Sequence, residues 1–129
     1  MAEAPKVLIA EDDHFLSSLL KARLEKEGFV VKTVFDGGEA LTYLKEFQPD
    51  LIVLDLIMPS VSGFEMLEQT SIDPQYNKIP VIILTNLGQE EDIQQAKQLG
   101  AVEYLVKARS SVEDIAAAVK NHINIAPQQ

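Results

Sequence analysis

Short apolar runs alternate along the chain with longer segments in which apolar residues recur every three or four positions. Five of the short runs are rich in β-branched residues, and they lie at 7–10, 29–34, 51–54, 81–84 and 102–106. A run that is apolar at every position is typical of a strand buried on both faces, as in a parallel sheet. Lys32 and Glu103 interrupt the second and fifth runs, which we therefore expect at the sheet edges.

The segments between these runs have helical periodicity. The first, 13–27, places leucines at positions 16, 20 and 24, with Leu19 beside them, and ends at Gly28. The second opens at Asp36, where Glu39 three residues later indicates a capping box, and ends before Pro49. The other helices are expected over about 63–69, over about 89–99, and from Ser110 or Ser111 onward.

Five strand–helix repeats in strict alternation predict an α/β fold with a five-stranded parallel sheet flanked by five helices. The doubly wound, flavodoxin-like strand order 2-1-3-4-5 accommodates this pattern. The most apolar runs, at 7–10, 51–54 and 81–84, should then be the central strands. We expect one domain over 1–129, with a core at 5–124 and a tail at 125–129.

Charge and composition exclude several classes of function. The 129 residues include no cysteine, which removes thiol chemistry, and the net charge is −9. Such an acidic domain repels phosphate backbones and anionic lipid, so we expect no direct binding to nucleic acid or to a membrane. The chain begins without a signal-peptide pattern and has no long apolar stretch, which favours a cytoplasmic location.

Polar side chains follow four of the five predicted strands. Glu11 and Asp12 follow the first, Asp55 the third, Thr85 the fourth and Lys107 the fifth. In a parallel sheet of this order, the carboxyl ends of the strands form the ligand site. Clustered carboxylates favour Mg²⁺, a carboxylate can attack phosphorus, and an ammonium group with a hydroxyl can stabilise a phosphoryl group. The set is therefore chemically complete for accepting a phosphoryl group.

Four stretches of sequence carry a family resemblance: 7–12, 49–59 with Gly63, 82–85, and 100–107. The residues Asp12, Asp55, Thr85 and Lys107 are separated by 43, 30 and 22 positions. With these stretches in this order, the chain resembles the CheY-like receiver domain of two-component response regulators over residues 5–124. The resemblance implies a signalling phosphoacceptor, which catalyses only its own phosphorylation and dephosphorylation.

The resemblance implies a role for each site residue. Asp55 would take the phosphoryl group from a sensor histidine kinase or a histidine phosphotransfer protein, in a Mg²⁺-dependent reaction. The face formed by the fourth helix, fifth strand and fifth helix would then signal to a downstream protein target or effector domain, as a monomer or a phosphorylation-dependent dimer. The remaining roles would be metal binding for Glu11, Asp12, Asp55 and the Ile57 backbone carbonyl, phosphoryl contact for Lys107, and switching for Thr85 and Tyr104.

Two positions depart from the family pattern. Ala108 stands where the family usually has a proline joined by a cis peptide, and we predict a trans peptide because cis before a non-proline costs about 3 kcal/mol. Asn86 stands where a small residue is common, so it either narrows the path of Thr85 or forms a hydrogen bond near the phosphoryl site. Ile57 and Leu87 occupy positions that influence dephosphorylation in the family, and their bulk predicts slow attack by water.

Other interpretations of the same residues are open. A Mg²⁺-dependent phosphatase with an aspartate nucleophile usually has a second acid two residues later, where this chain has Ile57. A flavin or nucleotide binder would need a glycine- or hydroxyl-rich loop after the first strand, and a receiver could also act only as a binding platform. Locally, Asp13 is expected to be an ordinary acid at a helix N-terminus, where the helix dipole favours it, His14 to face solvent, and Tyr104 to be either packing or a switch. The chain is either a stand-alone receiver or a domain of a longer regulator.

Overall fold

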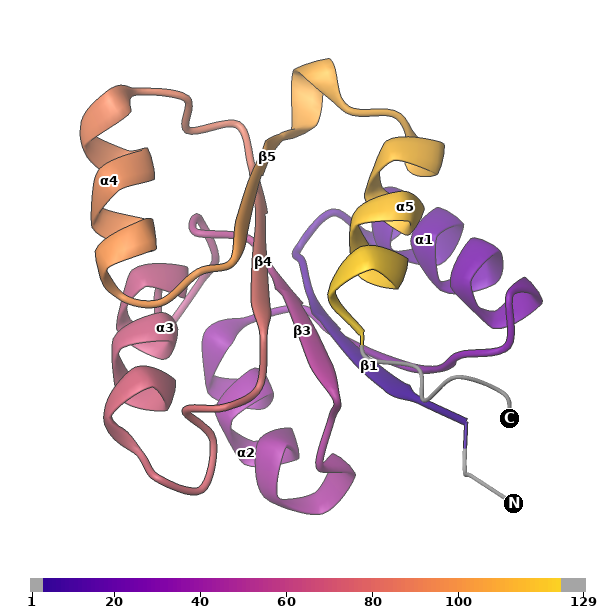
Figure 1. Ribbon diagram of the computed structural model, residues 1–129, viewed down its shortest axis with the longest axis horizontal. Coiled ribbons are helices and arrows are strands. Elements are labelled where there is room, and N and C mark those ends of the chain that lie inside the picture. The colour runs from indigo at the N-terminus through magenta and orange to yellow at the C-terminus, as the bar shows by residue number, and fades with distance from the viewer. Residues whose placement is uncertain (1–3, 124–129) are drawn as a thin grey trace.

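A computed structural model describes residues 4–123, in which five parallel strands form a single sheet (Figure 1). The strand order is β2-β1-β3-β4-β5, so the predicted order and the predicted edge strands are confirmed. The strands are β1 (Lys6–Ala10), β2 (Val30–Val34), β3 (Leu51–Leu54), β4 (Val81–Thr85) and β5 (Glu103–Val106). The helices are α1 (His14–Lys26), α2 (Gly37–Phe47), α3 (Gly63–Ile72), α4 (Glu90–Gln98), the 3₁₀ turn η1 (Lys107–Arg109) and α5 (Val112–His122).

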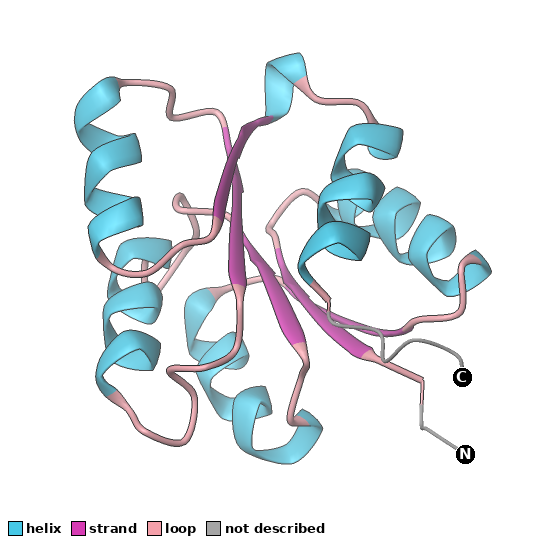
Figure 2. Ribbon diagram, in the orientation of Figure 1, coloured by secondary structure: helices cyan, strands magenta, loops and turns pink. Residues whose placement is uncertain are grey.

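The helices cover both faces of the sheet. In Figures 1 and 2, α1 and α5 lie on one side of the strands, and α2, α3 and α4 lie on the other. Successive strand residues point to opposite faces, so alternate residues of one strand belong to two different cores. In β1, Val7 and Ile9 pack towards α1 and α5, whereas Leu8 and Ala10 pack towards the other three helices. This two-sided burial explains why the central runs are apolar throughout.

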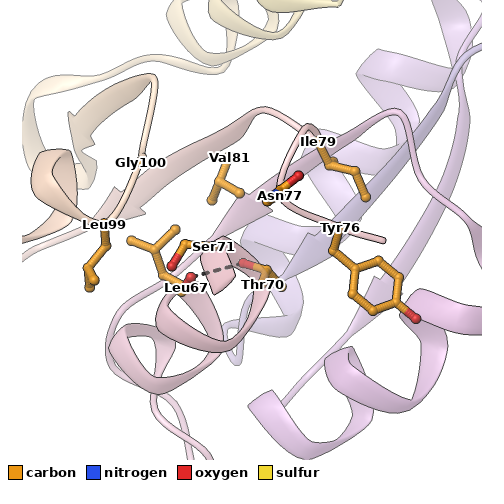
Figure 3. Close-up of a pocket in the computed structure, with 9 residues that line it drawn as sticks. All are labelled: Leu67, Thr70, Ser71, Tyr76, Asn77, Ile79, Val81, Leu99 and Gly100. Carbon is orange, nitrogen blue, oxygen red and sulfur yellow. Dashed lines mark hydrogen bonds between the residues drawn. The ribbon is translucent and has the colours of Figure 1, made fainter. Parts of the chain in front are cut away.

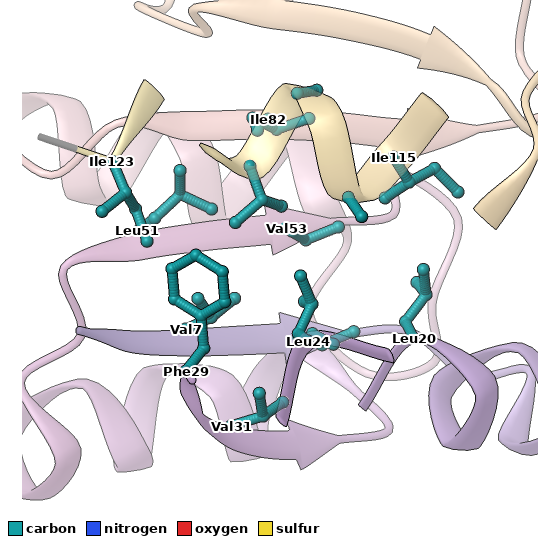
Figure 4. Packing of buried hydrophobic residues seen from close by; sticks show 14 of the residues in the cluster. Val7, Leu20, Leu24, Phe29, Val31, Leu51, Val53, Ile82, Ile115 and Ile123 are labelled. Carbon is teal, nitrogen blue, oxygen red and sulfur yellow. The ribbon is translucent and has the colours of Figure 1, made fainter. Parts of the chain in front are cut away.

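The core under α1 and α5 is built mainly from aliphatic side chains of the three central strands and the two helices, with Val31 of β2 and Phe29 packed beside them (Figure 4). Leu20 and Leu24 of α1 and Ile115 of α5 are buried, as their spacing predicts. Leu19, which the sequence places with them, is 42% exposed. A helix turns about 100° per residue, so Leu19 is rotated away from Leu20 to the edge of the buried stripe.

Local side-chain caps fix where several helices begin. Asp13 lies at the N-terminus of α1 as expected, and it caps the helix by accepting hydrogen bonds from the backbone N–H groups of Phe15 and Leu16. Ser111 forms a reciprocal capping box at α5, which settles the choice between Ser110 and Ser111. At α2, Asp36 accepts from the Glu39 N–H, but the Glu39 carboxylate accepts from Phe35 N–H instead of Asp36 N–H, so the predicted box is not closed.

One other helix boundary differs from the sequence prediction. Helix α3 continues to Ile72, three residues beyond the expected end, because no helix breaker occurs before Pro74. Gly28, with φ of +99°, ends α1 as predicted.

The predicted tail at 125–129 lies outside the described residues. Among the described helices, none combines the length and the hydropathy needed to cross a membrane.

Candidate functional site

The register of the sheet brings the predicted site residues to one edge. Ala10 of β1 pairs with Leu54 of β3, and Thr85 of β4 pairs with Val106 of β5, so the two strands of each pair end level with each other, and all four end at the same edge of the sheet (Figure 1). The residue that follows each strand therefore projects into the same region. The sequence located these polar residues only by their position after apolar runs, and the parallel register is what makes them neighbours.

Lys107 bridges two buried carboxylates. Its Nζ lies 2.8 Å from Asp55 Oδ2 and 2.7 Å from Glu11 Oε1. Asp55 is 3% exposed and Glu11 is 1% exposed, so both acids are removed from solvent. Buried charges need partners and hydrogen bonds, and one lysine serves two acids here. With Lys107 charged and both acids ionised, the three side chains together carry an excess negative charge.

Backbone N–H groups orient both buried acids. Asp13 N–H donates to Glu11 Oε2 at 2.9 Å, and Ile57 N–H donates to Asp55 Oδ1 at 3.1 Å. Asp55 Oδ2 is the atom that faces Lys107. Each carboxylate is therefore held from two sides, by its own loop and by Lys107, the first residue after β5. The Ile57 side chain itself is 55% exposed.

Glu11, Asp12 and Asp55 form a cluster that could hold a cation. One carboxylate oxygen from each lies within 4.8 Å of those of the other two. Asp12 is exposed while the other two are buried, so the cluster opens towards solvent on the Asp12 side. Glu11 Oε1 is buried and, despite its closeness to Lys107, accepts no hydrogen bond of good geometry. An all-oxygen donor set with an incompletely satisfied buried oxygen fits a hard divalent cation.

The pKa of Glu11 is raised mainly because the side chain is buried. Burial, and to a smaller extent the neighbouring Asp55 carboxylate, raise the pKa of Glu11 against the lowering effects of Lys107 and the Asp13 N–H, and the net result is a pKa of about 7. For Lys107, burial lowers the pKa, but the hydrogen bonds to Asp55 and Glu11 outweigh it and leave the pKa above its usual value. Lys107 therefore stays positively charged at neutral pH, whereas Glu11 gains or loses its proton near neutral pH.

Thr85 and Tyr104 lie close to this cluster, but their hydroxyl groups are hydrogen-bonded to the backbone of Leu87. Thr85 is fully buried at the end of β4, and its Oγ1 accepts from the Leu87 N–H at 3.4 Å. The Tyr104 hydroxyl donates to the Leu87 carbonyl at 2.5 Å, and its half-buried position raises the pKa of the phenol. No hydrogen bond within residues 4–123 joins either side chain to Asp55 or Lys107. The structure thus assembles the acids and the lysine, and leaves Thr85 and Tyr104 as a neighbouring pair linked through Leu87.

Three further contacts lie around the site, and of these the sequence anticipated only a hydrogen bond of Asn86, as one of two alternatives. The His14 ring, exposed as expected, stacks on Phe35 with centroids 3.8 Å apart and planes 6° apart. The start of α3 packs so closely on β3 that a Cβ at Gly63 would lie 2.2 Å from the Asp55 carbonyl oxygen. The Asn86 side-chain carbonyl accepts from the Ala108 N–H at 3.1 Å. No cis peptide occurs in the described chain, so the predicted trans bond before Ala108 is confirmed.

A shallow pocket lies at the opposite edge of the sheet, where β4 and β5 begin (Figure 3). Its walls come from the end of α3, the loop before β4 and the end of α4, with Leu67, Val81 and Leu99 among the lining residues. Thr70 in this wall already donates its hydroxyl to the Leu67 carbonyl at 3.0 Å. The pocket has no Asp, Glu, Lys, Arg or His among its lining residues, so it offers no chemistry comparable to the acid cluster.

Comparison with known proteins identifies the family of the chain. The response regulator receiver domain family matches residues 7–120. The phosphate regulon transcriptional regulatory protein PhoB of Rhizobium meliloti is 40% identical over 109 residues, which are 84% of this chain and 48% of that protein. Protein PilH of Pseudomonas aeruginosa is 35% identical over 102 residues, covering 79% of this chain and 84% of that protein. The chain thus spans about half the length of the first of these relatives and most of the second.

Solved structures give the same result for the fold. The Vibrio cholerae chemotaxis protein CheY4 superposes with a TM-score of 0.84 at 31% identity, covering 93% of this chain and 98% of that one. The phosphorylated cyanobacterial phytochrome response regulator RcpA superposes with a TM-score of 0.80 at 29% identity, covering 98% and 97%. The family match, the relatives and the shared fold lead to one conclusion: the chain belongs to the response regulator receiver domains, the signalling modules of two-component systems.

Proposed function

We propose that this receiver accepts a phosphoryl group on Asp55 in a Mg²⁺-dependent reaction and passes the signal to a partner through its α4-β5-α5 face. The observation that carries the proposal is the meeting of Glu11, Asp12, Asp55 and Lys107 at the carboxyl ends of three strands. Receiver domains take phosphoryl groups from histidine kinases and signal to effectors. The donor proposed for this chain is therefore a phosphohistidine on a sensor kinase or a phosphotransfer protein.

Asp55 is the proposed nucleophile because it is fixed and poorly solvated. One carboxylate oxygen attacks phosphorus, a P–O bond forms, and the P–N bond of the phosphohistidine breaks. The electron pair stays on the imidazole nitrogen, which the donor protein or solvent protonates. The Ile57 N–H holds Asp55 Oδ1, and Lys107 contacts Asp55 Oδ2 at 2.8 Å, so the lysine ammonium is in place to neutralise charge on the incoming phosphoryl oxygens.

Glu11, Asp12 and Asp55 are the side chains proposed to hold Mg²⁺, together with the Ile57 backbone carbonyl. Their oxygen donors fit the ion, which when bound supplies positive charge at the phosphoryl oxygens. Binding would require Glu11 to be ionised, and its pKa of about 7 makes cation affinity sensitive to pH in the neutral range. Asp12 would be the more direct ligand of the pair because it faces the open side of the cluster.

Thr85 and Tyr104 are proposed to carry the change away from Asp55. The Thr85 hydroxyl is weakly engaged, with the Leu87 N–H 3.4 Å away, so it can exchange this partner for a phosphoryl oxygen. Movement of Thr85 displaces Leu87, whose carbonyl accepts the Tyr104 hydroxyl. The path from Asp55 to the β5 surface therefore runs through a loop with hydrogen bonds at each end. Adding a charged group that re-pairs local donors is a known way to bias such an element.

The proposal is tested by incubating the protein with acetyl phosphate and Mg²⁺ and measuring phosphoryl incorporation by intact mass. The wild type should be modified, and omission of the divalent ion or the change Asp55→Asn should abolish the modification. Asp50→Asn is a matched control, because Asp50 immediately precedes β3 and Asp55 immediately follows it. Equal incorporation into Asp55→Asn and the wild type would refute the proposal.

A further inference from the structure

The turn that carries Lys107 is closed at its end by Ser110, whose hydroxyl donates to the Val106 carbonyl at 2.9 Å and whose N–H donates to the Lys107 carbonyl at 3.3 Å, but neither bond involves the Ala108 N–H. Within η1, Lys107 is partly exposed and neither Ala108 nor Arg109 is buried. The first N–H groups of a helical turn have no partner inside the turn, and the cap residue Val106 provides no side-chain hydrogen bond. The Ala108 N–H would therefore point to solvent unless another segment supplied an acceptor.

Asn86 supplies that acceptor. Its Oδ1 lies 3.1 Å from the Ala108 nitrogen, across 22 residues of sequence. The contact follows from the sheet, because Thr85 and Val106 are register partners and the residues just after them lie side by side. The alanine makes the bond possible, since a proline at 108 would have no N–H to donate.

A second bond ties the same two segments together. The Tyr104 hydroxyl donates to the Leu87 carbonyl at 2.5 Å, three residues before Lys107. The loop after β4 is therefore bonded to the chain on both sides of Lys107. Leu87 is bonded to Tyr104, which precedes the lysine, and Asn86 is bonded to Ala108, which follows it. Of these two bonds, only the one from Asn86 reaches the 3₁₀ turn itself.

The position of this turn decides where the lysine ammonium can lie. A lysine side chain is a flexible four-carbon stem, and holding its end against two acids costs conformational entropy. Lys107 Nζ nevertheless lies within 2.8 Å of oxygens from both Asp55 and Glu11. When the backbone at Lys107 is fixed, the lysine side chain has fewer conformations available, and a larger share of them place the ammonium group against the two acids. We therefore propose that Asn86 is a positioning residue for Lys107, acting through the Ala108 N–H, an inference that rests on the proposed phosphorylation of Asp55.

The first test measures the rate of Asp55 phosphorylation by acetyl phosphate at saturating Mg²⁺. Asn86→Ala should lower the maximal rate roughly five-fold, the equivalent of one neutral hydrogen bond. The acetyl phosphate concentration at half-maximal rate should stay as in the wild type, and the thermal unfolding midpoint should fall by no more than a few degrees. Asn121→Ala, an exposed asparagine on α5, is the matched control and should leave the rate unchanged. An unchanged rate in Asn86→Ala overturns the inference.

The second test asks whether Asn86 acts through the lysine. In a Lys107→Ala background, Asn86→Ala should slow phosphorylation no further, because the group it positions is gone. Ala108→Pro removes the donor, so it should slow the reaction about as much as Asn86→Ala, and the double variant should be no slower than either single variant. An undiminished effect of Asn86→Ala in the Lys107→Ala background would mean that Asn86 acts independently of Lys107, and would overturn the inference.

The two levels of proposal fail in different ways. Failure of the wild type to be modified, or equal modification of Asp55→Asn, refutes the proposed function. Normal, Asp55-dependent modification of the wild type with an unaltered rate in Asn86→Ala refutes only the role of Asn86.

Discussion

Replacing Glu11 by glutamine should change how the stability of the metal-free protein depends on pH. Glu11 is 1% exposed, and its pKa is raised from 4.5 to about 7, mainly by burial. Between these two values the folded protein holds a proton that the unfolded chain releases. Raising the pH through this window therefore lowers the free energy of unfolding. This loss of stability is complete once the pH exceeds the pKa of about 7 that Glu11 has in the folded protein.

The size of this effect follows from the width of the window. One pKa unit corresponds to about 1.4 kcal/mol, so the shift of Glu11 makes the wild type lose about 2 to 3 kcal/mol between about pH 5 and pH 8. Glutamine does not titrate, so the stability of Glu11→Gln does not fall for this reason as the pH rises. Groups common to both proteins cancel when the two free energies of unfolding are subtracted. The free energy of unfolding of Glu11→Gln minus that of the wild type should therefore increase by about 2 to 3 kcal/mol as the pH rises from about 5 to about 8.

The assay is urea unfolding in the presence of a chelator, followed by far-ultraviolet circular dichroism at several pH values. The m-value should be the same in both proteins, so that a shift in midpoint reports stability alone. Glu68→Gln, at an exposed position of α3, is the control and should follow the wild-type pH profile. Parallel profiles for Glu11→Gln and the wild type between about pH 5 and pH 8 would refute the burial argument.

Four further predictions concern the site and its supports. Added Mg²⁺ should raise the unfolding midpoint more at about pH 8 than at about pH 5, because cation binding needs ionised Glu11, and equal shifts would contradict this. Gly63→Ala should cost about 1 to 3 kcal/mol in urea unfolding, since its Cβ would lie 2.2 Å from the Asp55 carbonyl oxygen, and a neutral change would show that α3 can move away. Leu20→Ala should cost about 2 to 5 kcal/mol in the same assay, because the side chain is fully buried, and a cost below that range would mean that the core collapses into the cavity. Ser111→Ala should cost about 1 kcal/mol by removing the cap of α5, as thermal unfolding can measure, and an unchanged midpoint would show that the cap contributes nothing.

Most of the fold could be predicted because its signals are local or periodic. A strand buried on both faces must be apolar at every position, so the central strands stand out in the sequence. The ends of helices were less certain. Helix α3 exceeds its predicted end because the termination signal at Pro74 lies further along, and Leu19 is exposed because one helical step takes it out of the buried stripe.

The site was predictable to a similar degree. Glu11, Asp12, Asp55 and Lys107 could be grouped because each follows a strand, and parallel strands end at one edge of the sheet. Their spacing in the sequence does not reveal which oxygen meets which nitrogen, or that one lysine bridges two acids. These contacts depend on side-chain directions fixed by packing, which no local pattern records.

The sequence by itself determined the alternation of strands and helices, the central strands, and the order in which acids, threonine and lysine follow them. Only the tertiary structure decided how deeply Glu11 and Asp55 are buried, and therefore why the pKa of Glu11 rises to about 7. It also decided that the Asn86 amide meets the Ala108 N–H, a contact between segments 22 residues apart. The physical reason is that periodicity and strand ends are properties of the chain, whereas burial and hydrogen bonding between segments arise only when the sheet sets them side by side.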